Sequence, residues 1–422
     1  MSTTAEKLQI IIDNKAAIKQ AIIEKGGEVG DFTTYASAIA NLPSGGGGGD
    51  VNPTAEKNDV TFYDYDGTIR YSYTAEEFLA LTEMPPLPTQ KGLICQEWNW
   101  SYEDAMEYVA EYGVLDVGAT YITDNGKTRL YIRIAAEGRM DVPLYFQQTI
   151  ANGVVIDWGD GSATETLDGT GYINTTHHYN AIGDYCISLD VADRCTLTLG
   201  HRINSYCIMG STGNNGKVYC NMLRKVEVGA RVFGLTASCF AYCESLLSVT
   251  IPSYITVMSS NAFAYCYSIS ALIIPNGVKS LELSSLYDAN SLNIIVLPNS
   301  VTSIKPRVLM SPSLSSVVIP GLILEITMSG CRSLSSVIFP SSIENLPAEA
   351  FYNCYGMAFY DFSHHTAVPT LNNANAFTSI PEDCKIIVPD ALYDEWIAAT
   401  NWSTYASYII KKTDWDASKN IQ

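Results

Sequence analysis

Five short segments end in proline and decide the fold: SVTIP at 248–252, ALIIP at 271–275, IIVLP at 294–298, SVVIP at 316–320 and SVIFP at 336–340. The prolines recur every 20 to 23 residues, and a leucine or isoleucine stands six residues before each of them. A fixed period of this length is typical of a solenoid, in which each repeat forms one coil and packs only on its neighbours. The sequence therefore predicts a solenoid, a fold that presents an extended surface.

Cysteines follow the same register. Cys243, Cys266 and Cys331 stand nine residues before a proline, where small apolar thiols would fill a narrow core. Two middle repeats have Ala289 and Ser311 instead, so we expect their coils to differ in shape. Most of the 11 cysteines lie on the repeat, and the amino terminus has no basic and apolar leader. We interpret the cysteines as reduced core residues, neither disulfides nor zinc ligands.

The repeat unit FxxCxSLxSVxIPxxVxxIxxxAF resembles the BspA-like leucine-rich repeat, first from Phe240 to Phe263 and, in degraded form, to Phe351 and Cys354. The resemblance implies a leucine-rich-repeat solenoid, which we assign to residues 201–383.

The sequence changes character over residues 384–422, which we assign to a C-terminal cap and tail. We expect a helix there that carries Leu392, Trp396 and Ile397. The last coil of a solenoid exposes one face of the core, and a bulky amphipathic helix would cover it. The phrase CKIIVPDALYDEWIAATNWSTYASYIIKK also resembles the ending of other BspA-like repeat proteins.

Residues 1–42 are predicted to be helical, with one helix over 4–25, a shorter one over 32–42, and a glycine-rich linker at 43–58. A segment of this length is too short for a core of its own, so its apolar face would pack against copies of itself or another protein. Packing against the next domain of the same chain is the alternative. The residues of this oligomerisation and anchor face are Leu8, Ile11, Ile18 and Ile22.

Residues 59–136 have the pattern of a small α+β module, with aromatic-rich strands, a helix around 101–111 and a closing strand LYIRIAA. FYDYDGT at 62–68 imitates the first motif of haloacid-dehalogenase phosphatases, in which Asp64 and Asp66 would act around magnesium. We favour a hairpin, because Asp66-Gly67 lies between two alternating strands and such turns need positive φ at both central residues.

Residues 137–200 contain WGDGS at 158–162 and, later, HHYNAIGDY at 177–185. Both pieces resemble a polycystic-kidney-disease-type β-sandwich, and the match is carried by Trp158, Asp160, Gly161, His178, Tyr179, Gly183 and Tyr185. We expect the glycines to allow a tight turn in which Asp160 accepts backbone N–H bonds. Calcium held by Asp157 and Asp160 is the alternative, but two carboxylates fall short of the six to eight oxygens that calcium takes.

Together these parts predict a multidomain, mainly β protein: an N-terminal helical oligomerisation segment, a small α+β module, a β-sandwich, and a leucine-rich-repeat solenoid with a C-terminal cap. The formal net charge of −19 argues against a nucleic-acid partner, which needs clustered positive charge. No apolar run is long enough to insert into a membrane. We find no catalytic constellation, phosphate loop or metal-ligand spacing, and expect a non-enzyme without cofactors.

The run from Lys7 to Pro43 resembles the amino-terminal segments of phage and prophage tail or fibre proteins. That resemblance implies a structural bacteriophage virion protein, assembled in the bacterial cytoplasm and docked on other virion proteins through residues 1–42. We expect a homo-oligomer, with a trimer favoured, whose repeat domain binds a glycan or protein of the host surface. Candidate contact residues are Tyr242, Tyr265, Tyr267, Tyr287 and Arg332.

Three alternatives stay open. A capsid-mounted head fibre or decoration protein would share every feature and differ in where residues 1–42 dock. A bacterial surface adhesin of the BspA type would need a signal upstream of the present start. A glycan depolymerase is the least favoured, because no active site is visible in the sequence.

Overall fold

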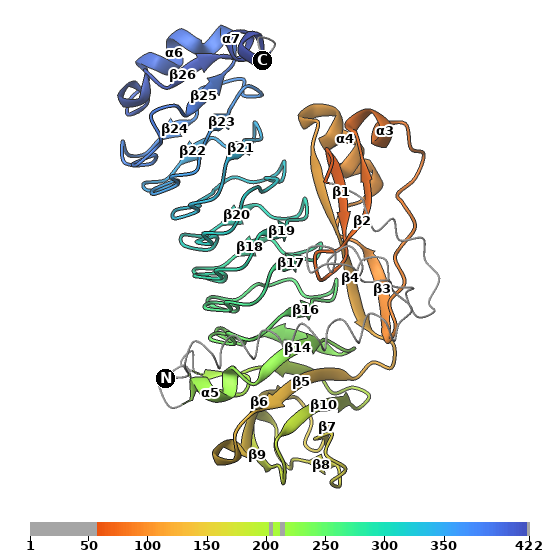
Figure 1. Ribbon diagram of the computed structural model, residues 1–422. Coiled ribbons are helices and arrows are strands. Elements are labelled where there is room, and N and C mark those ends of the chain that lie inside the picture. The colour runs from red at the N-terminus through yellow and green to blue at the C-terminus, as the bar shows by residue number, and fades with distance from the viewer. Residues whose placement is uncertain (1–56, 202–205, 212–215, 420–422) are drawn as a thin grey trace, which may run out of the picture. The chain divides into compact units, whose positions relative to one another are not determined.

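The computed structural model describes residues 57–201, 206–211 and 216–419. The features below belong to one compact unit within residues 55–88 and 92–422 (Figure 1). The predicted helices at 4–25 and 32–42, the anchor face Leu8, Ile11, Ile18 and Ile22, and the glycine-rich run lie outside the described residues. The described part is mainly β, as predicted.

The α+β module is a four-stranded sheet of order β2-β1-β4-β3 with two helices. Its elements are β1 (Val60–Tyr63), β2 (Ile69–Tyr73), α3 (Ala75–Leu79), β3 (Leu93–Trp98), α4 (Tyr102–Tyr112) and β4 (Leu115–Thr123). The predicted helix is confirmed as α4, which begins because the Ser101 side chain accepts a hydrogen bond from the Asp104 N–H, 3.1 Å away. It ends at Gly113, whose φ of 74° suits glycine.

The predicted hairpin is confirmed, but its turn differs from the expected one. β1 and β2 pair antiparallel, and the Gly67 N–H donates to the Asp64 carbonyl at 3.0 Å. Gly67 has positive φ and Asp66 does not, so the expectation of two positive φ angles was wrong. A tight turn followed by one left-handed glycine forms a bulge and needs only that glycine. The Asp64 carboxylate is buried and paired with the Arg70 guanidinium.

The strand LYIRIAA does not close the α+β module. It forms β5 (Thr128–Ile134), the third strand of a six-stranded sheet of order β16-β14-β5-β10-β7-β8. The other members are β7 (Val154–Asp157), β8 (Glu165–Thr166), β10 (Gly183–Val191), β14 (Leu223–Glu227) and β16 (Ser248–Thr250). The predicted module boundary at 136 is therefore corrected, because the partners of β5 come from later in the chain.

A second sheet of order β15-β11-β6-β9 completes the sandwich region. Its strands are β6 (Asp141–Gln148), β9 (Gly171–His178), β11 (Leu197–Leu199) and β15 (Val232–Leu235). β14, β15 and β16 belong to the residues assigned to the solenoid, so the two predicted domains share sheets. They also share one continuous hydrophobic core, which extends from Leu130 to Ile409. Sandwich and solenoid are thus fused rather than separated at residue 200.

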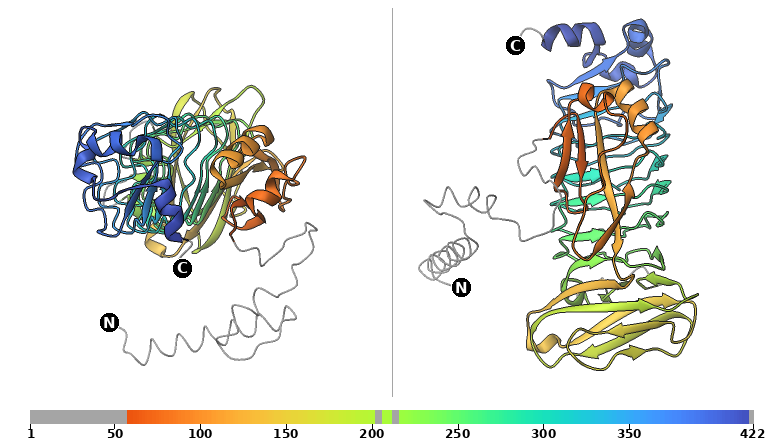
Figure 2. Two further views of the ribbon diagram at one scale, coloured as in Figure 1. Left: turned by 90° about the horizontal axis from the view of Figure 1, so that it is seen from above. Right: turned by 90° about the vertical axis from the view of Figure 1, so that its right-hand side faces the viewer.

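The solenoid stacks its coils in parallel, as Figures 1 and 2 show in green to blue. One row of strands consists of β17 (Ala271–Ile273), β19 (Ile294–Val296), β21 (Ser336–Ile338), β23 (Phe359–Asp361), β25 (Lys385–Val388) and β26 (Ile409–Lys411). A second row consists of β18 (Ser280–Leu281), β20 (Ser303–Ile304), β22 (Asn345–Leu346) and β24 (Thr370–Leu371). The leucine or isoleucine six residues before each proline is fully buried in every coil. The predicted solenoid is confirmed.

The cysteine position supplies a hydrogen-bond donor inside the coil. The Cys266 thiol donates to the Phe240 carbonyl of the preceding coil, and Cys354 donates to Met328, both at 3.2 Å. Ser311 keeps this function, since its hydroxyl donates to the Ala289 carbonyl at 2.8 Å. Burial raises the pKa of the Cys354 thiol to about 12, which keeps it protonated. Packing of the repeat cysteines is confirmed.

The repeated prolines remove backbone donors from the first row of strands. In the β17–β19 ladder, the Ile274 N–H donates to the Val296 carbonyl at 3.0 Å. By the same register, the Ile274 carbonyl faces the nitrogen of Pro298, which has no hydrogen. Pro298 thus leaves a carbonyl of the preceding coil without a ladder donor.

A side chain of the α+β module supplies the missing donor, and two more donate to the carbonyls that precede Pro298 and Pro320. Asn99 Nδ2 donates to the Ile274 carbonyl at 2.9 Å, Trp100 Nε1 donates to Leu297 at 2.8 Å, and the Tyr108 hydroxyl donates to Ile319 at 2.8 Å. All of these bonds are buried, which makes an unpaired carbonyl costly. The module therefore packs alongside the coils as part of the solenoid structure (Figure 2).

The C-terminal cap covers the last coil with a 3₁₀ turn, α6 (Tyr393–Ala398), the turn Trp402–Tyr405 and α7 (Lys412–Lys419). Trp396 and Trp402 are fully buried, with ring centroids 5.4 Å apart. Leu392 ends the 3₁₀ turn Asp390–Leu392 and lies just before α6, so the expected helix starts one residue later.

The cap also buries His365, which should make stability depend on pH. Its Nε2 lies 3.3 Å from the Ile343 carbonyl, while Nδ1 has no partner among the described residues. Burial lowers the pKa of His365 from 6.5, with a smaller effect of His364 in the same direction. It outweighs the opposite effects of the Ile343 and Phe362 backbone and of Asp361. The unfolded chain then binds the proton more readily, so stability should be full above about pH 6.5 and fall as the pH drops below it. Urea unfolding at pH 7.5 and 5.5 measures this loss, and His365→Gln should reduce it.

Candidate functional site

The structure brings together four of the five residues proposed for receptor contact. Tyr242 and Tyr265 occupy the same position of successive coils, and their rings stack with centroids 4.3 Å apart at 13°. Tyr265 also lies edge-on to Tyr287 at 5.4 Å and to Tyr267 at 6.3 Å. All four rings are half-buried. We call Tyr242, Tyr265, Tyr267 and Tyr287 the tyrosine cluster.

Local backbone conformation turns two of these rings outward. Tyr242 and Tyr265 have φ of 62° and 61°, immediately before the buried Cys243 and Cys266. A non-glycine residue in this left-handed conformation is uncommon, and the next coil has Asp288 there with φ of 59°. The coil therefore reverses direction at this position and presents its side chain outward while the cysteine points into the core.

Arg332 is not part of the tyrosine cluster. It follows the buried Cys331 as Tyr267 follows Cys266, so it occupies an equivalent position in a later coil. Its side chain is exposed. The structure thus places the fifth candidate on the same type of corner but separates it from the others along the solenoid.

Sequence reasoning missed Lys217, which closes one end of the cluster. Its ammonium nitrogen lies 3.8 Å from the centroid of the Tyr242 ring, a cation–π contact. Because Tyr265 covers the other side, little of the Tyr242 ring remains free for a ligand. Lys217 stands 23 residues before Phe240, where the repeat has a phenylalanine, so the repeat pattern gave no signal for a lysine there.

Carboxylates flank the tyrosine cluster and set its charge. Burial, followed by the negative charges of Asp288 and Glu244, raises the pKa of Tyr267. Burial and the neighbouring Tyr242 raise the pKa of Tyr265, with a smaller effect of Asp288. The phenols therefore stay neutral, and the surface combines aromatic rings and hydroxyls with negative charge.

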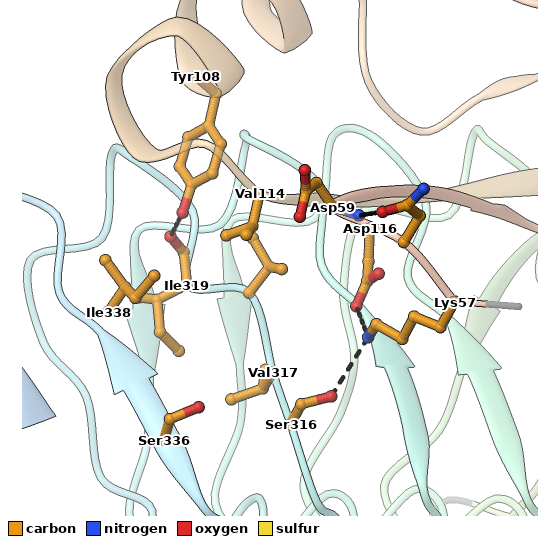
Figure 3. A pocket seen from close by; sticks show the side chains of 12 residues that line it. Lys57, Asp59, Tyr108, Val114, Asp116, Ser316, Val317, Ile319, Ser336 and Ile338 are labelled. Carbon is orange, nitrogen blue, oxygen red and sulfur yellow. Dashed lines mark hydrogen bonds and ion pairs between the residues drawn. The ribbon is translucent and has the colours of Figure 1, made fainter. Parts of the chain in front are cut away.

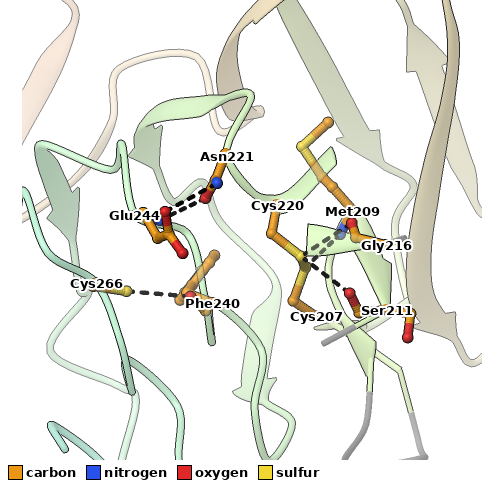
Figure 4. Close-up of a disulfide and its surroundings, with 9 residues drawn as sticks. All are labelled: Cys207, Met209, Ser211, Gly216, Cys220, Asn221, Phe240, Glu244 and Cys266. Atoms are coloured by element: carbon orange, nitrogen blue, oxygen red, sulfur yellow. Dashed lines mark hydrogen bonds between the residues drawn. A yellow bond between two sulfur atoms is a disulfide. The ribbon is translucent and has the colours of Figure 1, made fainter. Parts of the chain in front are cut away.

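A disulfide joins Cys207 to Cys220, three residues after Lys217 (Figure 4). It links β12 (Tyr206–Cys207), which pairs with β13 (Gly210–Ser211), to α5 (Lys217–Cys220), the helix that carries Lys217. The interpretation of all cysteines as reduced was therefore wrong for this pair. Cys220 continues the repeat register, 23 residues before Cys243, whereas Cys207 lies off it, and their pairing depends on tertiary proximity.

Asn221, the residue after Cys220, connects this helix to the coil that carries Tyr242. Asn221 Oδ1 accepts from the Glu244 N–H at 3.0 Å, and Asn221 Nδ2 donates to the Glu244 carboxylate at 3.2 Å. The disulfide thus fixes both Lys217 and Asn221 against the coil that carries Tyr242.

Removing the disulfide should loosen this end of the cluster. The double variant Cys207→Ala, Cys220→Ala opens a loop with a sequence separation of 13 residues and should lower the free energy of unfolding by roughly 3 kcal/mol. Nitration of Tyr242 by tetranitromethane, read by peptide mass spectrometry, should also become faster. Lys217→Ala with the disulfide intact is the control, and it should speed nitration without the same loss of stability. Unchanged nitration in both variants would contradict the covering of Tyr242 by Lys217.

The WGDGS segment forms a packed cluster. Gly159 and Gly161 have positive φ, and Asp160 Oδ1 accepts the Ser162 N–H at 3.0 Å, as expected for the turn. Asp160 Oδ2 also lies 2.8 Å from His177 Nε2. The Tyr179 hydroxyl donates to the Trp158 carbonyl at 2.8 Å. In this segment the side chains therefore serve to pack the sandwich and to form the turn.

Within the residues that the structure describes, no other cluster of metal-ligating side chains is found. There, no group of three or more His, Cys, Asp or Glu side chains is placed to hold a metal ion. His178 points away from His177 and pairs with Asp141 at 2.8 Å. His364 packs on Tyr112 at 4.8 Å between ring centroids, and His365 is buried in the cap. Among the helices described, none is long and apolar enough to cross a membrane.

Comparison with known proteins identifies the repeats. The family of the BspA type leucine rich repeat region matches residues 213–329 and 323–393, in 6 copies. No curated protein matches the chain.

Among solved structures, the leucine rich repeat protein of T. pallidum is 24% identical and covers 37% of this chain and 75% of its own, with a TM-score of 0.33. A leucine rich cell surface protein from Faecalibacterium prausnitzii is 18% identical, covering 47% and 76%, with a TM-score of 0.27. A leucine-rich repeat protein from Bacteroides ovatus is 14% identical, covering 44% and 66%, with a TM-score of 0.24. The family match itself identifies the C-terminal region as BspA-like leucine-rich repeats.

Proposed function

We propose that this protein is a non-catalytic adhesion protein that binds a glycan or protein of a cell surface through its solenoid. The tyrosine cluster is the observation that carries the proposal. Half-buried aromatic rings held by a rigid coil give contact area at little entropic cost, and tyrosine is enriched at binding surfaces for this reason. Tyr267 and Tyr287 are the principal contacts, because Lys217 and Tyr265 cover the ring of Tyr242.

The second part of the proposal concerns the structure to which the protein is attached, a virion or a bacterial surface. Residues 7–43 resemble phage tail or fibre segments, which supports a virion fibre that docks through residues 1–42, as a homotrimer, on tail or capsid. The BspA-like repeats support a bacterial surface adhesin as the alternative. The Cys207–Cys220 disulfide suits either, because disulfides persist on virions as well as on exported proteins. The resemblance of residues 137–200 to polycystic-kidney-disease-type domains supports a spacer role for the sandwich.

Binding to cells tests the adhesive surface. The double variant Tyr267→Ala, Tyr287→Ala should reduce binding of fluorescently labelled protein to host cells at least tenfold, because aromatic contact residues dominate such interfaces. The matched control is Tyr172→Ala, an exposed tyrosine on β9 of the sandwich. Equal binding of both variants and the unmodified chain would show that adhesion uses another surface.

Immunogold electron microscopy with antibody against the solenoid tests whether the protein is attached to a phage tail, to a capsid or to a cell surface. Label on the tail tips or capsid of purified particles would support the corresponding fibre. Label on cells and none on particles would support the surface adhesin and contradict the virion assignment.

A further inference from the structure

A pocket of about 210 Å³ lies where the α+β module meets the coil that ends at Pro320 (Figure 3). Its wall is mainly aliphatic, with Val114 from the module and Val317, Ile319 and Ile338 from two coils. The mouth carries Lys57, Asp59 and Asp116. The pocket is separate from the tyrosine cluster and has no part in the proposed adhesion.

The pocket lies at an interruption of the solenoid sheet. SVVIP at 316–320 has the repeat pattern, yet in the described structure it forms no strand and pairs with neither β19 nor β21. The Ile319 carbonyl is held instead by the Tyr108 hydroxyl at 2.8 Å. The pocket lies beside the valines of this segment, between it and the module.

The charges at the mouth do not balance. Asp116 is 5% exposed, and its carboxylate lies 3.0 Å from the Lys57 ammonium, which also donates to Ser316 Oγ at 3.2 Å. The Lys57 side chain is 46% exposed, so much of its charge is screened by solvent. Burial raises the pKa of Asp116 despite this lysine. Asp59 also lines the pocket, and one of its carboxylate oxygens accepts the Ala75 N–H at 3.0 Å. The lining thus carries two carboxylates and one ammonium, and it favours an additional cation.

We propose that this pocket binds a small primary amine with a compact hydrocarbon body, placing the hydrocarbon against the valines and isoleucines and the ammonium at Asp116 and Asp59. The volume suits such a ligand, since an apolar cavity of about 150 Å³ is enough to hold benzene. Burial of the hydrocarbon supplies the favourable free energy, and the net negative mouth selects the charge.

Three ligands that share one ring test the charge selection with the full chain. Cyclohexylamine, cyclohexanol and cyclohexanecarboxylate fill the same space and carry a positive, zero or negative charge at pH 7. Titration calorimetry at low ionic strength should show the amine binding at least tenfold more tightly than the alcohol, and no binding of the carboxylate. Equal binding of amine and alcohol, tighter binding of the carboxylate, or no binding of the amine would each overturn the proposal.

Variants locate the amine in this pocket. Val114 is half-buried at the wall, so Val114→Phe should fill the space without disrupting a core and abolish binding. Asp116→Asn should weaken amine binding at least tenfold and leave cyclohexanol unaffected. If that variant fails to fold by circular dichroism, Asp59→Asn at the exposed mouth replaces it and should weaken amine binding several-fold. Asp184→Asn, at a carboxylate 74% exposed elsewhere, is the control and should change nothing. Undiminished binding to Val114→Phe would overturn the assignment.

Discussion

Replacing Trp402 by alanine should lower the free energy of unfolding of the capped coils by about 4 kcal/mol, as expected when a large buried aromatic side chain is removed. Trp402 is fully buried, and its Nε1 donates to the Pro369 carbonyl at 2.7 Å. Its ring lies 5.5 Å from Phe362 and 5.6 Å from Phe377, the aromatic residues of the last coils. The substitution leaves both a cavity and an unpaired carbonyl.

The loss should be local at first, because each coil of a solenoid is stabilised by its immediate neighbours. Hydrogen exchange should show early opening of β23 and β25, while the sandwich strands remain protected. Trp415→Ala provides the matched control, since this tryptophan of α7 is half-buried and packs on Phe359 at 5.3 Å. Equal effects of the two substitutions would contradict the role of Trp402 in closing the core.

Asn99→Ala should destabilise the protein by about 3 kcal/mol, because it leaves two buried backbone groups without partners. The Asn99 side chain donates to the Ile274 carbonyl at 2.9 Å and accepts the Gly118 N–H at 2.8 Å. It therefore joins a solenoid coil to β4 of the α+β module. Chemical denaturation measures the change, with the exposed turn residue Asn125→Ala as the control.

A second substitution tests why Asn99 is needed. Pro298→Ala returns an N–H to the coil opposite the Ile274 carbonyl, so it should recover roughly 1 kcal/mol in the Asn99→Ala background. In the unmodified protein the carbonyl already has a donor, and Pro298→Ala should give no gain. Additive effects in this double-mutant cycle would contradict the account of proline-orphaned carbonyls.

Local patterns in the sequence were sufficient for several elements. Ser101 and Gly113 mark the ends of α4, and Asp66-Gly67 marks the hairpin, because caps and turns depend on residues close together in the chain. The turn type was missed, since the same dipeptide fits more than one loop and the register of β1 and β2 chooses between them.

Long-range pairing could not be predicted in the same way. LYIRIAA alternates as a strand should, but alternation does not name its partners, and β5 pairs with β10 and β14. Cys207 lies off the repeat and Cys220 continues its register, so spacing gave no reason to join these two. Lys217 reaches Tyr242 from α5, the helix that this disulfide joins to β12.

The sequence by itself determined the solenoid, because proline, leucine and cysteine recur at one period and each coil repeats the same local chemistry. It also supplied the tyrosines, without telling which of them meet. Tertiary structure decided that Tyr242, Tyr265, Tyr267 and Tyr287 form one cluster and that Arg332 stands apart. It also placed Trp100 against Leu297 and opened the pocket beside Asp116. Such contacts join residues far apart in the chain, and only the folded backbone path brings them within reach.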